Sequence, residues 1–314
     1  MVLPDAPPYV LAHPDTDADA DGDELRYTPI AATEIAEFER DGLLLVPGAL
    51  DTVQLGRLTE AVDRVYVDEA AAGRIAPGAA LHLLGMLDRD PALLDLVDHA
   101  ATFRYVWGLM GWNVYTHHNH LDVHPGVASA PRPPWNWHQD GYRQNSDIAS
   151  DLRPMLSMKV AYVLTDLTAT GRGATQVIPG SHRRNTLAGR PSDPKDEYVD
   201  PDGAREIRAR AGDAFVFDRR LWHSRSVNRS AVTRKIVFVG YTHRWIRPLD
   251  EVNYRDRAEW FGELSPVRQQ LLGGGADHAN YWGVDQGGWI DKAIPLRAEL
   301  AERGLLDGSR SYLR

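Results

Sequence analysis

The chain contains no cysteine, so disulfide bonds and thiolate metal sites are excluded. It also has no run of about 18 apolar residues, and we therefore expect no membrane-spanning helix. No basic region followed by an apolar stretch stands near residue 1, so we expect no secretory signal and a cytoplasmic location. The 43% of hydrophobic and 25% of charged residues are ordinary proportions for a globular protein.

Basic residues are absent from residues 1–25, which contain seven aspartates and glutamates. Without these seven the net charge of −9 falls to −2, so the body of the chain is nearly neutral and a nucleic-acid partner is not expected. The segment has little to bury, and we expect it to be a disordered acidic tail before a single domain at 26–314. A calcium loop at 15–22 is the alternative, but flanking helices and a closing glutamate are missing.

Two histidines and one aspartate form the most informative pattern. His138 and Asp140 are two residues apart in Trp-His-Gln-Asp, so on an extended segment both side chains lie on the same side. His223 follows in a second motif, and two imidazoles with one carboxylate are the facial ligand set of non-haem Fe(II) sites. The alternative for a lone His-x-Asp pair is a histidine held by a carboxylate on a surface turn, since the chain has 12 histidines.

Arg234 lies eleven residues after His223. Its guanidinium is suited to gripping a carboxylate through two parallel hydrogen bonds. A metal triad followed by a carboxylate clamp is the set that a 2-oxoglutarate-dependent oxygenase needs.

These motifs, in this order, resemble those of the phytanoyl-CoA dioxygenase family of Fe(II)/2-oxoglutarate oxygenases. The resemblance runs from about Thr33 to Trp245 and includes Trp-His-Gln-Asp-Gly, a Pro-Gly-Ser-His turn and a Gly-Asp turn before the distal histidine. It implies Fe(II) held by His138, Asp140 and His223, with 2-oxoglutarate and O₂ as cosubstrates and Arg234 on the far carboxylate of 2-oxoglutarate.

The helices are expected near the start of the chain. Thr33 is expected to cap one helix, Asp51 to cap a second that runs to about Ala72, and residues 91–99 to form a third. From Tyr105 onward the pattern changes to short extended runs, at 113–123, 156–164, 174–178, 214–217 and 235–242. Such strands, together with the motifs, predict a mainly β fold with added helices, a cupin-like double-stranded β-helix of the jelly-roll type. The polar insertions 145–153 and 186–202 are plausible lid loops.

A row of histidines begins at residue 117. In a strand, His118, His120, Asp122 and His124 would share one face. One interpretation is a cupin-like metal site with His118 and His120 as ligands, although the glutamate of such sites is missing. A second is a pocket wall beside the iron, in which the resemblance puts His120 at a position that contacts 2-oxoglutarate. Buried histidines bonded to the backbone are the third.

Three more residues are candidates with open alternatives. Arg225 stands where the family has a small residue, and it would bind 2-oxoglutarate, bind an anionic or carbonyl-rich substrate, or form a surface salt bridge. Tyr162 is either core or a wall of the substrate pocket. His182, in Pro-Gly-Ser-His, is expected to be a structural turn residue.

The expected function is hydroxylation of an unactivated C–H bond in a small polar metabolite, in natural-product biosynthesis such as that of an antibiotic. A pocket with Arg225 and several imidazoles favours such a substrate over a fatty acyl-CoA, as does the absence of an evident basic cluster for CoA phosphates. Desaturation, epoxidation, ring closure and a non-catalytic metal-binding sensor are the alternatives, while Asp140 argues against a halogenase. The oligomeric state stays open.

Overall fold

Two facing β-sheets form the centre of the molecule. The computed structural model describes residues 9–10, 22–127, 134–148, 153–193, 196–250, 254, 259–274, 284–285, 288–289 and 294–309. The larger sheet has the strand order β2 (Leu43–Val46), β9 (Ala214–Asp218), β6 (Ser157–Val163), β11 (Arg234–His243), β5 (His120–His124) and β3 (Leu81–Leu84), with β4 (Val114–Thr116) also paired to β11. The smaller sheet has the order β1 (Tyr9–Val10), β8 (Arg205–Arg208), β7 (Thr175–Val177) and β10 (His223–Arg225).

The two sheets pack face to face through apolar side chains. Phe215 and Ile236 of the larger sheet belong to one buried cluster with Val177 and Ile207 of the smaller sheet. Neighbouring strands of the larger sheet are antiparallel, and only β1 and β8 pair in parallel among the described strands. Two packed sheets of this kind confirm the predicted jelly roll.

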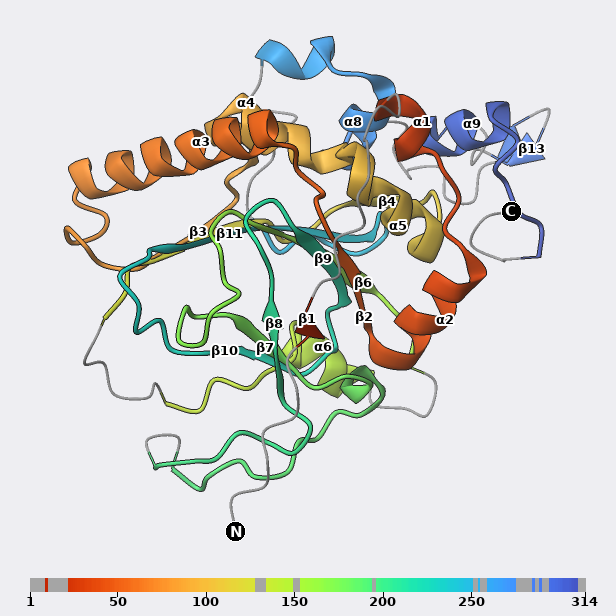
Figure 1. Ribbon diagram of the computed structural model, residues 1–314. Helices are drawn as coiled ribbons and strands as arrows, with labels where there is room; N and C mark the ends of the chain where they lie inside the picture. The colour runs from red at the N-terminus through yellow and green to blue at the C-terminus, as the bar shows by residue number, and fades with distance from the viewer. Residues whose placement is uncertain are drawn as a thin grey trace.

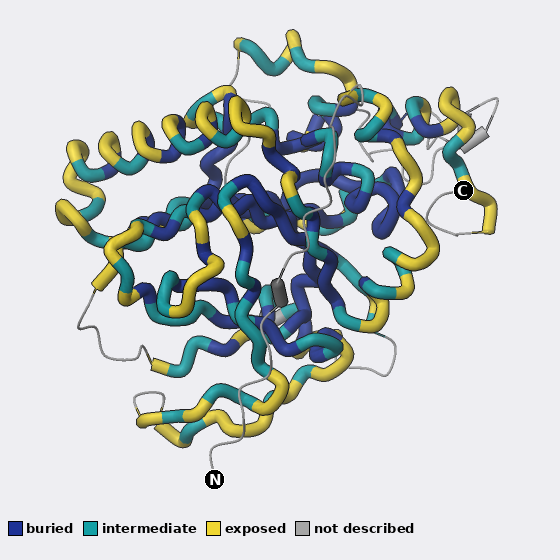
Figure 2. Tube along the Cα trace, viewed as in Figure 1, coloured by how far each residue is buried: buried dark blue, intermediate teal, exposed yellow. Residues whose placement is uncertain are grey.

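Helices cover the outer face of the larger sheet (Figure 1). The principal ones are α3 (Thr52–Ala71), α4 (Pro91–Leu94) and α5 (Ala100–Met110). Their apolar side chains, such as Val62 and Val106, share a second buried cluster with Val160 and Val239 of the sheet. In Figure 2, the turns of α3 alternate between the exposed colour and less exposed colours, as those of an amphipathic surface helix do.

The remaining elements lie around this framework. They are α1 (Gly22–Arg26), α2 (Ala32–Asp41), α6 (Tyr142–Asp147), α8 (Pro266–Leu271), α9 (Pro295–Glu302), the 3₁₀ turns η1 (Leu87–Arg89), η2 (Asp95–Asp98), η3 (Ser181–Arg183) and η4 (Glu259–Glu263), and the pair β12 (Val284–Asp285) and β13 (Gly288–Trp289). Among the described residues, no helix combines the length and the apolarity needed to cross a membrane.

The caps of the first two long helices test the helix predictions. Asp51 caps α3 as predicted, because its carboxylate accepts a hydrogen bond from the backbone N–H of Gln54 at 2.8 Å. The prediction for Thr33 is wrong, since α2 begins at Ala32 and Ala31 is the cap residue. Ala31 makes no side-chain cap hydrogen bond, but Glu34 accepts from the backbone N–H of Ala31 at 2.6 Å.

The predicted change to strands at Tyr105 is wrong, because α5 continues to Met110. This helix lies between the sheet and other helices, and most of its side chains are buried. A helix that is apolar on nearly all sides lacks the periodicity that separates helix from strand in a sequence. Residues 91–99 are helical as predicted, divided between α4 and η2.

The expected strand at 113–123 is two strands, β4 and β5, with a break at 117–119. The break is held against β11, where a Cβ at Gly240 would lie 2.6 Å from the carbonyl oxygen of His118. Glycine therefore allows the two backbones to approach closely. The other expected strands correspond to β6, β7, β9 and β11.

The acidic segment is described only at Tyr9–Val10 in β1 and at the start of α1. The candidate calcium loop lies outside the described residues, apart from Gly22 at the start of α1. Disorder of the rest of the segment stays a prediction.

Candidate metal centre

His138, Asp140 and His223 converge at one end of the space between the sheets. One potential ligand atom from each lies within 4.8 Å of the other two. Nε2 of His138 is 4.0 Å from Oδ1 of Asp140, and Nε2 of His223 is 3.9 Å from Oδ2. His138 and His223 are also cross-strand neighbours that exchange two backbone hydrogen bonds of 3.0 Å, which fixes their relative positions.

The second nitrogen of each imidazole is held by the backbone. Nδ1 of His138 lies 2.8 Å from the carbonyl oxygen of Asn136, and Nδ1 of His223 lies 2.7 Å from that of Leu221. Each Nδ1–H therefore donates to a carbonyl, and the lone pair of Nε2 is left for a metal. Burial lowers the pKa of His223 to about 4, which keeps this ring neutral at neutral pH. The donor set and its orientation fit Fe(II).

Lys159 of β6 is part of this centre, and the sequence did not single it out. Its ammonium lies 2.8 Å from Oδ2 of Asp140, and its side chain is almost fully buried. Burial alone would raise the pKa of Asp140, but Lys159 and the two imidazoles lower it below its usual value. The available signal was a lysine inside an apolar strand, Ser-Met-Lys-Val-Ala-Tyr-Val, in which every residue is buried.

Replacing Lys159 by methionine should destabilise the protein without metal by about 1–3 kcal/mol, since the buried Asp140 carboxylate loses its cation. Metal loading should recover much of this loss, because the metal then takes over the carboxylate. Thermal unfolding with and without Ni(II) measures both quantities. The same loss in Lys235→Met, which removes an ammonium paired with the exposed Asp63, would show that the effect is not specific to the centre.

Arg234 is a buried cation with unused hydrogen-bond donors. It is 2% exposed, and its Nε and Nη1 have no hydrogen-bond partner. Nη2 lies 3.4 Å from the hydroxyl of Thr175, and Nη1 lies 3.5 Å from a carboxylate oxygen of Asp122. Burial lowers the pKa of Arg234 to about 10, so the group is still charged at neutral pH. Free donors on a charged guanidinium fit the far carboxylate of 2-oxoglutarate.

An imidazole wall, made by His82, His118 and His120, lies beside Phe238. The ring of His120 stacks on Phe238 with centroids 4.5 Å apart, while His118 and His82 lie 5.2 and 4.8 Å from His120. Burial lowers the pKa of His118 to about 4 and that of His120 well below its usual value. The sequence put His118 and His120 on one face and missed His82, which comes from the adjacent strand β3.

The structure contains a second group of possible metal ligands, but it is not the cupin-like pair of His118 and His120. His120 groups instead with His82 and Asp122, but Asp122 also lies within ion-pair distance of Arg234. Its pKa is held well below its usual value against the effect of burial, through His124, His82 and Arg234 among its neighbours. Asp122 is therefore shared between His82, whose Nδ1 lies 2.7 Å from Oδ1, and Arg234.

Arg225 points to the same region from β10. Nη1 lies 2.6 Å from Nδ1 of His124, and the side chain is half-buried. Burial lowers the pKa of Arg225, with Asp122 acting in the opposite direction. The surface salt bridge that was one alternative for Arg225 is not formed with any carboxylate that the structure describes.

Two of the remaining candidates are structural. Tyr162 is fully buried on the helix-facing side of β6, where its hydroxyl lies 2.6 Å from that of Thr102 on α5. The alternative of a pocket wall is therefore wrong, and Tyr162 belongs to the core. Side chains alternate along β6, so Tyr162 points to the face of the sheet away from Lys159. His182 packs on Gly42, where a Cβ would lie 2.5 Å from the imidazole, so it is the turn residue that the sequence predicted.

Comparison with known proteins agrees with this geometry. The family model of phytanoyl-CoA dioxygenase (PhyH) matches residues 38–236. An ectoine dioxygenase of Bordetella bronchiseptica is 25% identical over 246 residues, which cover 68% of this chain and 75% of the relative. An L-proline trans-4-hydroxylase of Streptomyces griseoviridis is 27% identical over 237 residues, 65% of this chain and 83% of the relative.

Solved structures show the same fold. EctD from S. alaskensis with 2-oxoglutarate and 5-hydroxyectoine superposes with a TM-score of 0.55 at 21% identity, over 74% of this chain and 83% of EctD. HygX from Streptomyces hygroscopicus with nickel and 2-oxoglutarate has a TM-score of 0.56 at 13% identity, over 74% of this chain and 95% of HygX.

Proposed function

Because this chain belongs to the phytanoyl-CoA dioxygenase family, we propose that it hydroxylates an unactivated C–H bond of a small polar metabolite in natural-product biosynthesis. The chain is a 2-oxoglutarate-dependent non-haem iron dioxygenase. The observation that carries the proposal is the convergence of His138, Asp140 and His223 in the same interior as Arg234, a buried guanidinium with free donors. The cytoplasmic location expected from the sequence stays a prediction.

In this proposal each residue has a separate task. When bound, Fe(II) and 2-oxoglutarate would supply the oxidation: O₂ and 2-oxoglutarate would become succinate and CO₂, with one oxygen atom inserted into the substrate C–H bond. His138, Asp140 and His223 hold the metal on one face and leave the opposite face for ligands. Arg234 orients the cosubstrate through its far carboxylate.

The polarity of the site supports a small polar substrate. Lys159 and Arg225 contribute cations, and His118 and His120 contribute neutral imidazoles that donate or accept hydrogen bonds. Nδ1 of His118 and Nδ1 of His120 have no hydrogen-bond partner, and a bare fatty chain would offer them none. The relatives named for ectoine and L-proline act on compounds of the proposed size.

The test is a screen of small metabolites with Fe(II) and 2-oxoglutarate, scored by succinate release and product mass. Hydroxylation adds one oxygen atom, whereas desaturation or ring closure removes two hydrogen atoms. Some solved structures with this fold are an epimerase and a carbocyclase of nogalamycin biosynthesis, so the product must be analysed beside succinate release; an epimerisation would leave its mass unchanged. Efficient hydroxylation of a long-chain acyl-CoA would overturn the substrate class, and no 2-oxoglutarate turnover under any condition would favour a sensor.

Arg225→Ala and His120→Ala should lower the coupling between 2-oxoglutarate consumption and product formation. Both side chains are proposed to hold the substrate against the metal centre, and a loosely held substrate presents its C–H bond less often. The ratio of product to succinate, measured for each variant, reports the coupling. Coupling equal to that of the wild type in both variants would remove these residues from the substrate site.

A further inference from the structure

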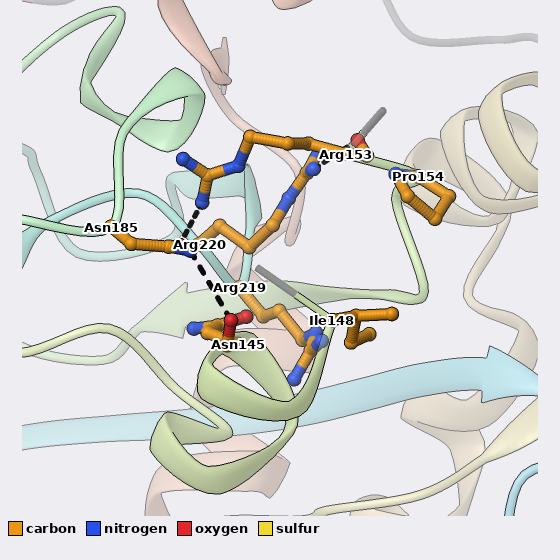
Figure 3. Close-up of a pocket in the computed structure, with 7 residues that line it drawn as sticks. All are labelled: Asn145, Ile148, Arg153, Pro154, Asn185, Arg219 and Arg220. Carbon is orange, nitrogen blue, oxygen red and sulfur yellow. Dashed lines mark hydrogen bonds between the residues drawn. The ribbon is translucent and has the colours of Figure 1, made fainter. Parts of the chain in front are cut away.

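Three arginines meet in a pocket that does not include the metal ligands (Figure 3). Arg153 lies just before β6, and Arg219 and Arg220 lie in the turn after β9. Asn145 of α6 and Asn185, just beyond η3, complete the polar wall, and Ile148 and Pro154 form the apolar edge. We call this the arginine pocket.

The charges in the arginine pocket are not balanced. Arg220 forms a two-pronged ion pair with Asp218, with contacts of 3.0 and 2.6 Å, so its charge is neutralised. Arg153 and Arg219 form no ion pair with any carboxylate in the described part of the chain. Arg153 donates instead to the side-chain oxygen of Asn185, and Arg219 to that of Gln144.

Burial makes this imbalance costly. Arg219 is 3% exposed, and its Nε is buried without a hydrogen-bond partner. Buried charges without partners are strongly unfavourable, so such an arrangement is expected where a ligand completes it. The local backbone is also shaped around the guanidinium: Gly141 has φ +67°, and a Cβ there would lie 1.9 Å from Nη1 of Arg219.

The side-chain amides of the arginine pocket donate hydrogen bonds to the backbone around it. Nδ2 of Asn185 donates to the backbone carbonyl of Asn145 at 3.2 Å, and Nδ2 of Asn145 donates to that of Asp140 at the same distance. The bond between Asn185 and Asn145 connects the two segments that face each other across the pocket (Figure 3). Recognition of a ligand is therefore left mainly to the guanidinium groups.

We propose that the arginine pocket binds a phosphate-type oxyanion, either free phosphate or the phosphate group of a small molecule. Two uncompensated guanidinium groups match the charge of a dianion, and guanidinium donors match the oxygens of phosphate in bidentate pairs. The pocket goes beyond the proposed oxygenase function, since neither Arg225 nor Arg234 lines it. It adjoins the metal centre through the backbone, because the carbonyl of Arg219 accepts from the N–H of Asp140 at 2.9 Å.

Calorimetric titration of the full metal-free chain with inorganic phosphate tests this site at constant ionic strength. The wild type should show saturable binding of one phosphate, and Arg153→Ala should weaken it at least about tenfold. Arg190→Ala, an exposed arginine, and Arg234→Ala, in the cosubstrate site, should change the affinity less than about twofold. Thermal unfolding of each variant establishes that it is folded, and Arg153→Lys provides a milder change if Arg153→Ala is not.

A second titration with glycerol 3-phosphate separates the two sources of the ligand. Equal affinity for both compounds would assign a free-anion site, whereas tighter binding of the ester would assign a site for a phosphate-bearing molecule. No saturable binding up to about 50 mM phosphate, or unchanged affinity in Arg153→Ala, overturns the proposal. Weakening in Arg234→Ala as large as that in Arg153→Ala would put the anion in the cosubstrate site and would also overturn it. Neither result depends on oxygenase turnover.

Discussion

His223→Ala is expected to abolish 2-oxoglutarate turnover and to weaken Fe(II) binding while the chain remains folded. His223 supplies one of three converging ligand atoms, and its Nδ1 is already engaged with the carbonyl of Leu221. Two remaining protein ligands cannot fix the metal and leave one defined face for substrate and O₂. Succinate release and Fe(II) titration measure the two losses.

The matched control is His243→Ala. His243 lies at the far end of β11 and stacks on Trp245, with ring centroids 5.5 Å apart. Its removal should leave turnover and metal affinity close to those of the wild type. Succinate formation at the wild-type rate in His223→Ala would refute the ligand assignment, and loss of both activities in His243→Ala would point to general destabilisation.

Short-range patterns predicted the parts of the site that lie on single segments. His138 and Asp140 are two residues apart on an extended segment, so their shared direction follows from strand geometry alone. The cap at Asp51 is equally local and was also predicted. In both cases the relevant contact is made between residues near in sequence, which is why one sequence sufficed.

Contacts between distant segments were beyond such patterns. Lys159 lies 19 positions after Asp140, and nothing in an apolar strand indicates which buried carboxylate a lysine will face. His82 reaches the imidazole wall only because β3 pairs with β5. The arginine pocket likewise combines residues 153, 219 and 220, so no basic cluster is visible in the sequence.

Burial on all sides explains the largest error in the fold. α5 has apolar residues around most of its circumference, since it lies between the larger sheet and the other helices. The same environment decides between the two alternatives for Tyr162, core and pocket wall. Its partner Thr102 is on α5, so a helix occupies that face of β6 and Tyr162 belongs to the core.

Arg234→Ala should raise the apparent KM for 2-oxoglutarate at least about tenfold. Losing one partner of a buried, charge-assisted pair costs on the order of 2–5 kcal/mol, and each 1.4 kcal/mol corresponds to about a tenfold change. We expect a rise of only about tenfold as the minimum, because Arg225 lies in the same region and its positive charge still attracts the carboxylate. Arg234→Lys keeps the charge and loses the planar guanidinium. Its KM for 2-oxoglutarate should therefore lie between that of the wild type and that of Arg234→Ala.

The readout that identifies the clamp is the split between KM and kcat. An arginine that only grips the far carboxylate of 2-oxoglutarate contributes to binding before and during the reaction, so its loss should affect KM far more than kcat. Arg303→Ala is the control, since this arginine at the end of α9 pairs with Glu299 and Asp23. An unchanged KM for 2-oxoglutarate in Arg234→Ala would move the clamp elsewhere, and the same measurement on Arg225→Ala would then decide whether that cation has the role.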